Sequence, residues 1–149
     1  MKKGSDEQPT GELEPRYTFI LNPYTSLRFS ICPGCGNRTR QRKLPLLIHV
    51  APHHLLLLHK TCRYCPDCDL LIVHQDELEE LLVAIFTEHD PTIIGNEYLV
   101  LGTVEHAAWR KRVSGVLPVN EVLDHLHSFK AVHQAQQRPA GWYPSAPDP

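Results

Sequence analysis

The chain has 149 residues, of which 42% are hydrophobic and 21% charged, a composition typical of a globular protein of about one domain. Its longest apolar run, at 55–58, is far too short to cross a bilayer, and no apolar segment follows the two N-terminal lysines. These features exclude a membrane-spanning helix and argue against a signal peptide. We therefore expect a cytoplasmic protein, in which cysteine thiols stay reduced.

The net charge of −2 conceals an uneven distribution of charge. No acidic residue occurs between Glu14 and Asp67, whereas eight lysines and arginines do, so this part of the chain carries a charge of +8. Such asymmetry suggests that the basic half contacts an anionic partner. The alternative is that the two halves neutralise each other within one fold.

Both ends of the chain are predicted to lie outside the folded part. Residues 1–15 are polar and rich in proline and glycine, which favours a flexible N-terminal segment. Residues 138–149 contain four prolines and predict a disordered Pro-rich tail, in which Trp142 and Tyr143 are candidates for a short binding motif. A single α+β domain is expected at 16–137.

Strand patterns dominate the first half of this domain. Short apolar, β-branched or alternating runs bounded by turn residues predict four strands, at 17–21, 45–50, 55–64 and 69–73. A helix is predicted next, at 76–90, because its apolar residues recur at helical spacing. Asp76 and Glu79 resemble a capping box at its start, and Asp90-Pro91 ends it.

The second half is predicted to contain one more strand and one more helix. Residues 98–105 follow a Gly-Asn turn and read as a strand, whereas 105–112 fits either a strand or a helical turn. Pro118 would open a C-terminal helix over about 119–136, whose buried stripe is expected to comprise Val119, Val122, Leu126 and Phe129.

Four of the five cysteines form two CPxC motifs, at 32–35 and 65–68. Paired CxxC spacings under reducing conditions are typical of metal ligands rather than disulfides. The proline sets φ for a tight turn, and Gly36 and Asp69 occupy the positions where the chain must leave that turn with a positive φ. The alternative is that the cysteines are buried as small apolar residues. We predict instead one Zn²⁺ per chain, bound by Cys32, Cys35, Cys65 and Cys68.

This pattern resembles the zinc-ribbon group, whose members pair a CPxCG knuckle with a second CxxC across β-hairpins. The resemblance covers roughly residues 30–73, from CPGCG at 32–36 to YCPDC at 64–68. It implies a structural metal, and it implies a binding role, because ribbons occur in transcription and translation factors, in nucleic-acid enzymes and in protein-interaction subunits. Rubredoxins also use two such knuckles, to hold one iron, so an iron electron carrier is the alternative; the basic surroundings favour zinc.

The segment NRTRQRK offers a candidate contact surface for nucleic acid. If it is a strand, alternate positions lie on one face, which would place three arginines together and allow them to follow phosphates. The alternative is a solvated face that protects an edge strand from aggregation. The candidate residues of this basic strip are Arg38, Arg40, Arg42 and Lys43.

No catalytic arrangement is recognisable. The chain has no GxSxG, P-loop, GxGxxG or HExxH motif, and a closed four-thiolate site leaves no coordination position for a reactive water. On the predicted C-terminal helix, His125 and His127 would point in different directions and could not share a metal. We therefore expect a non-catalytic module that binds nucleic acid or a protein partner. The fifth cysteine, Cys62, is expected to pack inside a strand, with a thiol redox role as its alternative.

Overall fold

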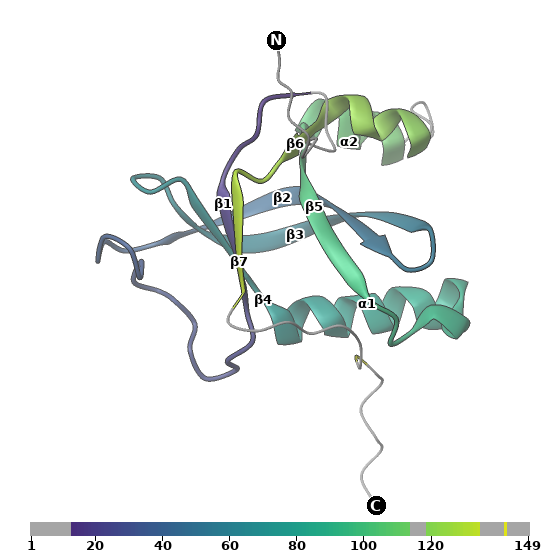
Figure 1. The fold of residues 1–149 in the computed structure, drawn as a ribbon, viewed down its shortest axis with the longest axis horizontal. Coiled ribbons are helices and arrows are strands. Elements are labelled where there is room, and N and C mark those ends of the chain that lie inside the picture. Colours follow the sequence, from purple (N-terminus) through teal and green to yellow (C-terminus); the bar gives the residue numbers. More distant parts are fainter. Residues whose placement is uncertain (1–12, 114–118, 135–141, 143–149) are drawn as a thin grey trace, which may run out of the picture.

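The computed structural model describes residues 13–113, 119–134 and 142 of the chain. The fold is mixed α+β, mostly strands with two α-helices (Figure 1). The elements follow in the order β1 (Thr18–Asn22), β2 (Arg40–Val50), β3 (His54–Cys65), β4 (Leu70–His74), α1 (Gln75–His89), the 3₁₀ turn η1 (Pro91–Ile93), β5 (Tyr98–Val104), α2 (His106–Val113), the 3₁₀ segment η2 (Val119–His125), β6 (Leu126–Ser128) and β7 (Ala131–Gln134). The α+β class and the strands expected in the first half are confirmed.

The strands form one mixed sheet in the order β6-β5-β2-β3-β4-β1-β7. Its centre is a long antiparallel hairpin, β2 with β3, in register from Arg40 opposite Tyr64 to Val50 opposite His54. β4 continues this arrangement antiparallel to β3, whereas β1 lies parallel to both β4 and β7. The strands of the expected ribbon are therefore part of a larger sheet.

The sheet curls until its two ends approach each other. Its outermost strands, β6 and β7, are separated by only Phe129 and Lys130, a connection that reaches about 10 Å. The segment before β1 also binds β6, because Leu13 N–H donates to the Leu126 carbonyl at 3.3 Å and Arg16 N–H to the Ser128 carbonyl at 2.8 Å. The strands consequently enclose a core (Figure 1).

Helix α1 covers this core at one end. Its apolar residues Leu78, Leu82 and Phe86 recur on one face, are buried, and join alternate residues of β2 in a single cluster. A second cluster lies around Leu47 and packs α2 and η2 against the other face of β2. The helical spacing at 76–90 therefore predicted the helix and most of the face that it buries; Leu81, which the same spacing places on that face, is exposed.

The predicted capping box at the start of α1 is wrong. The helix begins at Gln75, directly after β4, so its N-cap is His74, which makes no side-chain capping hydrogen bond. Asp76 thus lies in the first turn rather than at the cap. Its carboxylate is 3.6 Å from the Arg28 guanidinium.

The predicted C-terminal helix over 119–136 is also wrong. The segment forms η2, then β6 and β7. β6 pairs with β5, and β7 pairs with β1, so backbone hydrogen bonds at the two ends of the sheet replace those of a helix. Of the expected stripe, Val122 and Leu126 are buried, whereas Phe129 stacks on Phe19 at a centroid distance of 4.3 Å. The side chain of Val119 lies outside the described residues.

Trp142 belongs to the core. It is 3% exposed, its ring lies 6.1 Å from Tyr98 and 6.3 Å from Phe86, and its indole N–H donates to the Asn96 carbonyl. Trp142 is therefore not available as an exposed binding motif. Tyr143 and the rest of the predicted tail lie outside the described residues, as do 1–12 of the predicted N-terminal segment.

Candidate metal centre

The first CPxC motif forms a closed loop between β1 and β2. Gly36 N–H donates to the Cys32 carbonyl at 2.9 Å, and Cys32 N–H donates to the Asn37 carbonyl at 2.7 Å. Gly34 N–H points at the Cys32 sulfur, at 3.3 Å. Gly36 has a φ of 80°, so the positive φ expected after the second cysteine is confirmed.

The second motif forms the turn between β3 and β4. Asp69 leaves this turn with a φ of 53°, as expected of a residue in the place of the usual glycine. Its carboxylate accepts a hydrogen bond from Tyr17 N–H at 3.1 Å and forms an ion pair with the Lys130 ammonium at 3.0 Å. A glycine could make neither contact, so the aspartate ties this turn to the neighbouring segments before β1 and β7.

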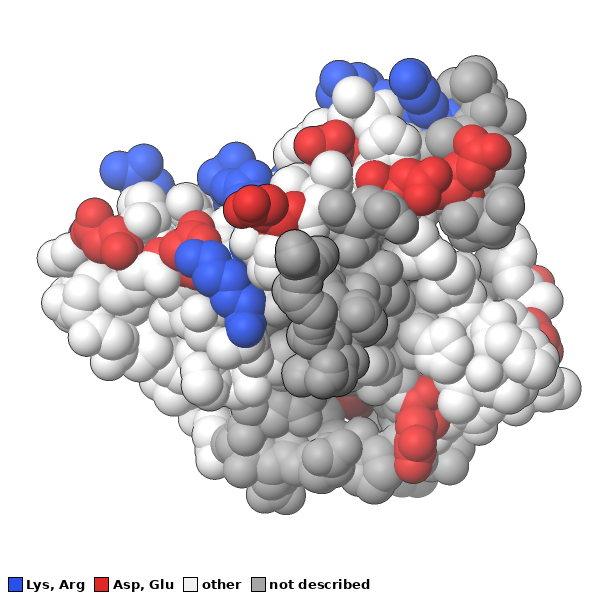
Figure 2. Space-filling model, turned by 45° about the horizontal axis from the view of Figure 1, so that its top comes forward, with Lys and Arg blue, Asp and Glu red and all other residues white. Residues whose placement is uncertain are grey.

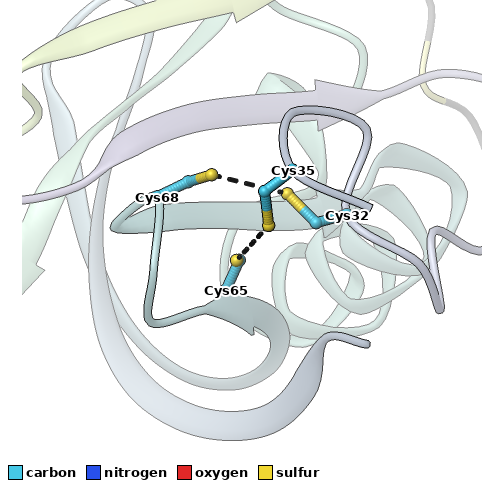
Figure 3. Close-up of side chains that lie close together, drawn as sticks. All are labelled: Cys32, Cys35, Cys65 and Cys68. Atoms are coloured by element: carbon cyan, nitrogen blue, oxygen red, sulfur yellow. Dashed lines mark hydrogen bonds between the residues drawn. The ribbon is translucent and has the colours of Figure 1, made fainter. Parts of the chain in front are cut away.

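The two motifs place four sulfur atoms in one group (Figure 3). All four lie within 4.8 Å of one another; Cys32 and Cys68 are 3.8 Å apart, and Cys35 and Cys65 are 3.6 Å apart. Thiolates about 2.3 Å from a central Zn²⁺ stand at corners of a tetrahedron whose edge is about 3.8 Å. A disulfide requires about 2.05 Å instead. The sulfur positions therefore fit a four-coordinate metal ion, and all four expected ligands are brought together.

The cysteine group is buried on one side and exposed on the other. The first cysteine of each motif is buried, with Leu70 and Ile72 in a small apolar cluster, whereas the second is exposed. A hydrogen bond of 2.7 Å from the Asn37 amide to the Asp67 carboxylate joins the two turns. Both pairs of ligands are therefore set by short, bonded turns on the same sheet.

Electrostatics also favour a cation at this position. Burial raises the pKa of Cys32, but the N–H groups of Cys35 and Gly34 and the nearby sulfurs outweigh it and hold that pKa at about 7. Hydrogen bonds to the sulfurs of Cys35 and Cys32 raise the pKa of Cys68 to about 12. Four crowded thiols cannot all lose their protons unless a cation compensates the charge. The residues present thus fit a thiolate-bound metal ion.

Cys62 lies apart from the four ligands. It is 2% exposed in the main core, and its thiol donates to the Lys60 carbonyl at 3.3 Å. Burial raises its pKa to about 12, which disfavours the thiolate that redox chemistry requires. The expectation that Cys62 packs inside a strand is consistent with this position.

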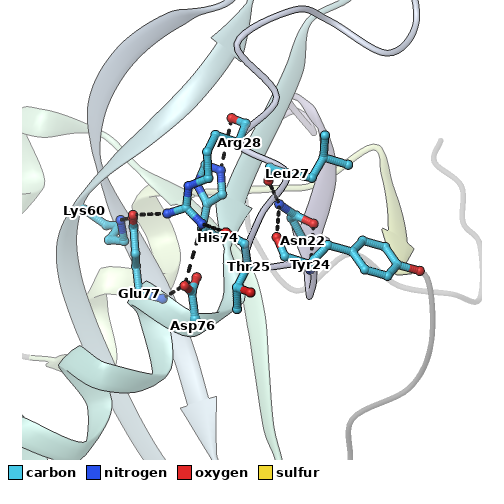
Figure 4. Close-up of polar contacts among 9 residues, drawn as sticks. All are labelled: Asn22, Tyr24, Thr25, Leu27, Arg28, Lys60, His74, Asp76 and Glu77. Atoms are coloured by element: carbon cyan, nitrogen blue, oxygen red, sulfur yellow. Dashed lines mark hydrogen bonds and ion pairs between the residues drawn. The ribbon is translucent and has the colours of Figure 1, made fainter.

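A polar cluster beside Cys62 was not anticipated from the sequence (Figure 4). The Lys60 ammonium is buried and lies 3.1 Å from Glu77 of α1, whose other oxygen binds Arg28. His74 lies 3.1 Å from the Arg28 carbonyl through its Nε2 atom. Lys60 lies two positions before Cys62 in β3 and therefore shares its inward face, where a charged residue requires a partner. The need of a buried charge for a partner was the one signal in the sequence that could have indicated this cluster.

The four residues of the basic strip are all exposed. Arg40 and Arg42 lie two positions apart on β2, so their side chains share a face, and Arg38 precedes the strand at a bridge to Ile31. Tyr64 stands opposite Arg40, and the Arg42 guanidinium lies 5.1 Å from its ring centroid. The fourth residue, Lys43, points to the other face.

The histidines form no metal group within the part of the chain that the structure describes; the cysteine group alone meets the distance requirement there. His125 ends the 3₁₀ segment η2 and His127 lies in β6, so the two do not share an α-helix; both approach the Glu105 carboxylate, at 3.8 and 3.5 Å. The expectation that both histidines lie on one C-terminal helix and point in different directions is therefore wrong. Both instead contact the same carboxylate. His59 packs on Trp109 at 4.1 Å.

Comparisons of the chain with protein-family models, with curated protein sequences and with solved structures found no match. The zinc-ribbon resemblance therefore stays a prediction from the two motifs. Among the described residues, no helix is both long and apolar enough to pass through a membrane.

Proposed function

We propose that this protein is a non-catalytic nucleic-acid-binding module whose sheet is stabilised by a four-thiolate Zn²⁺ centre. Cys32, Cys35, Cys65 and Cys68 would hold the ion. It would supply binding energy on the order of 10 kcal/mol to the folded state, because the ligands come together only on folding. With four thiolates present, the site has no open position for a substrate, which supports a structural role.

The observation that carries the nucleic-acid proposal is the exposed row of arginines around Tyr64. In the described part of the chain, no carboxylate lies within ion-pair distance of Arg38, Arg40 or Arg42. Arginines with a partly exposed aromatic ring between them suit a nucleic-acid strand, since phosphates bind the guanidiniums and a base can stack on the ring. On the face that Figure 2 shows, basic side chains adjoin acidic ones, so that face offers no continuous basic surface.

Zinc is tested by metal analysis of the purified full-length chain. We expect one zinc per chain and a colourless protein, and the ion should be lost on Cys68→Ser. The matched control, Cys62→Ala, should retain one zinc. A coloured, iron-containing protein would instead support the rubredoxin-like alternative, which uses the same four thiolates. Folding that is unchanged after chelation would contradict the structural role of the metal.

Nucleic-acid binding is tested by fluorescence anisotropy with single-stranded DNA and RNA at several salt concentrations. Replacing Arg38, Arg40 and Arg42 by Gln should lower the salt slope by about 2 to 3, as expected for the loss of three phosphate contacts. The matched control replaces Arg110, Lys111 and Arg112 of α2 by Gln, which removes the same charge elsewhere. Equal effects of the two triple variants, or no binding by the wild type at low salt, would contradict the proposal and favour a protein partner.

A further inference from the structure

A pocket of about 260 Å³ lies at one end of the curled sheet, apart from the metal centre. The segment before β1, β2, the end of β5 and β6 all contribute to it. β5 ends at Val104, whereas its neighbour β2 extends to Arg40, so this part of β2 has no strand beside it on that edge. The start of α2 also lines the pocket, and the lining residues that matter for its chemistry are Arg16, Tyr17, Arg42, Glu105 and His127.

Two arginines in this pocket are held against two tyrosines. The Arg16 guanidinium lies 4.6 Å from the centroid of the Tyr17 ring, and Arg42 lies 5.1 Å from that of Tyr64. The two tyrosine rings meet edge to face at 5.7 Å. Stacking orients a guanidinium and leaves its N–H edges free to bind an oxyanion. Within the described ranges, no carboxylate lies at ion-pair distance from either arginine.

The Tyr17 hydroxyl is a buried donor without a partner. Tyr17 is 1% exposed, and its oxygen has no hydrogen-bond partner in the described structure. Burial raises its pKa, against the charges of Arg16 and Arg42, so the group is a neutral O–H donor. Its backbone adopts a φ of 70°, uncommon for a bulky residue. A buried donor left unpaired is costly, and a ligand oxygen in the pocket would satisfy it.

The two carboxylates near the pocket contact other side chains rather than the two arginines. Glu105 lies between His125 and His127, at 3.8 and 3.5 Å, and Asp69 binds the Lys130 ammonium at 3.0 Å. Neither acid approaches the two arginines closely enough to neutralise them. Glu105 itself lines the pocket beside His127, so an anion that enters would meet two guanidiniums without a carboxylate partner, one hydroxyl donor and this carboxylate.

We propose that this pocket binds a phosphate monoester group. Such a group carries a charge of about −1.5 to −2 and three peripheral oxygens, which matches two guanidiniums and the Tyr17 hydroxyl. A carboxylate would offer one charge and two oxygens to the same three donors. The pocket shares Arg42 with the basic strip, but binding of a small phosphate does not depend on binding of a nucleic-acid strand, so this site goes beyond the function proposed above.

The test titrates inorganic phosphate into the full-length zinc-loaded protein and follows binding by calorimetry. We expect saturable binding that weakens about tenfold or more in Arg16→Gln and in Tyr17→Phe, because each removes one donor to a charged ligand. The control, Arg110→Gln on α2, should bind like the wild type. Tyr17→Phe keeps the ring and removes only an unpartnered hydroxyl, so without phosphate it should melt at or above the wild-type temperature.

A second experiment distinguishes a phosphate at a nucleic-acid end from a small phosphate ester. It compares the binding of one oligonucleotide with and without a 5′-phosphate. Tighter binding of the phosphorylated form, abolished by Tyr17→Phe, would assign the pocket to a nucleic-acid end. Equal binding, with inorganic phosphate still bound, would assign it to a small phosphate ester. The absence of saturable phosphate binding by the wild type would overturn the proposal, as would equal losses in Tyr17→Phe and Arg110→Gln.

Discussion

The ion pair between Lys60 and Glu77 offers a direct test of how α1 is attached to the sheet. The Lys60 side chain is 7% exposed, and its ammonium contacts only Glu77 Oε1 at 3.1 Å and the Thr61 carbonyl at 2.7 Å among the described residues. Glu77→Gln keeps the shape of the side chain but removes the charge that compensates the buried ammonium.

The expected cost follows from the exposure of the two partners. Removing one member of a fully buried pair costs about 3–5 kcal/mol. The Glu77 side chain is 45% exposed, so water reaches it and replaces part of the interaction, and Lys60 keeps its bond to Thr61. We expect Glu77→Gln to lower the free energy of unfolding by about 2 kcal/mol. The melting temperature should fall by on the order of 8 °C.

The assay is urea unfolding followed by circular dichroism with zinc in excess. Glu80→Gln is the matched control, because it makes the same change at an exposed position of the same helix and should cost under about 0.5 kcal/mol. A double-mutant cycle isolates the pair: in a Lys60→Met background, Glu77→Gln should cost at least about 1 kcal/mol less. Equal costs for Glu77→Gln and Glu80→Gln, or an unchanged cost in the Lys60→Met background, would refute this reasoning.

Three further predictions concern pH, packing and the spare thiol. Burial raises the pKa of Glu77, but the hydrogen bond to Lys60 and the charges of Lys60, His74 and Arg28 together outweigh burial and lower that pKa overall. The stability that these contacts contribute is therefore present above about pH 4.3 and is lost as the pH falls further. The difference in unfolding free energy between the wild type and Glu77→Gln should close over that range. Gly102→Ala should strongly lower the melting temperature, because a Cβ at this position would collide with the His127 carbonyl across the β5–β6 pair. A melting temperature within about 2 °C of that of the wild type, which is about the resolution of a thermal melt, would contradict this packing. Cys62 should resist iodoacetamide at pH 7.5 in the folded protein and react after unfolding, because burial raises its pKa to about 12. Mass spectrometry locates the modified residue, and rapid modification of Cys62 in the native protein would count against its buried position.

The parts of the fold that could be predicted from the sequence depend on local patterns. The positive φ values at Gly36 and Asp69 follow from the steric demands of the two turns. Helix α1 follows from its apolar spacing, and the inward position of Cys62 follows from strand alternation. Each of these inferences involves residues close together in the chain.

The errors arose where distant partners decided the outcome. The segment 119–136 has a helical apolar spacing, but β5 and β1 offered unpaired backbone groups at the two ends of the sheet, and strand pairing satisfied them. The cap of α1 moved to His74 because β4 runs directly into the helix. Neither the two C-terminal strands nor the position of the helix cap is encoded by the residues of the segment concerned.

The sequence by itself determined the candidate ligand set, because two short CPxC turns specify their own geometry. Only the tertiary structure decided what surrounds them. Curling of the sheet brought Arg16 and Tyr17 beside Arg42 and Tyr64, and it placed Glu77 over Lys60. These contacts join residues 17 or more positions apart, and their formation depends on strand register and burial, which no local pattern of residue types contains.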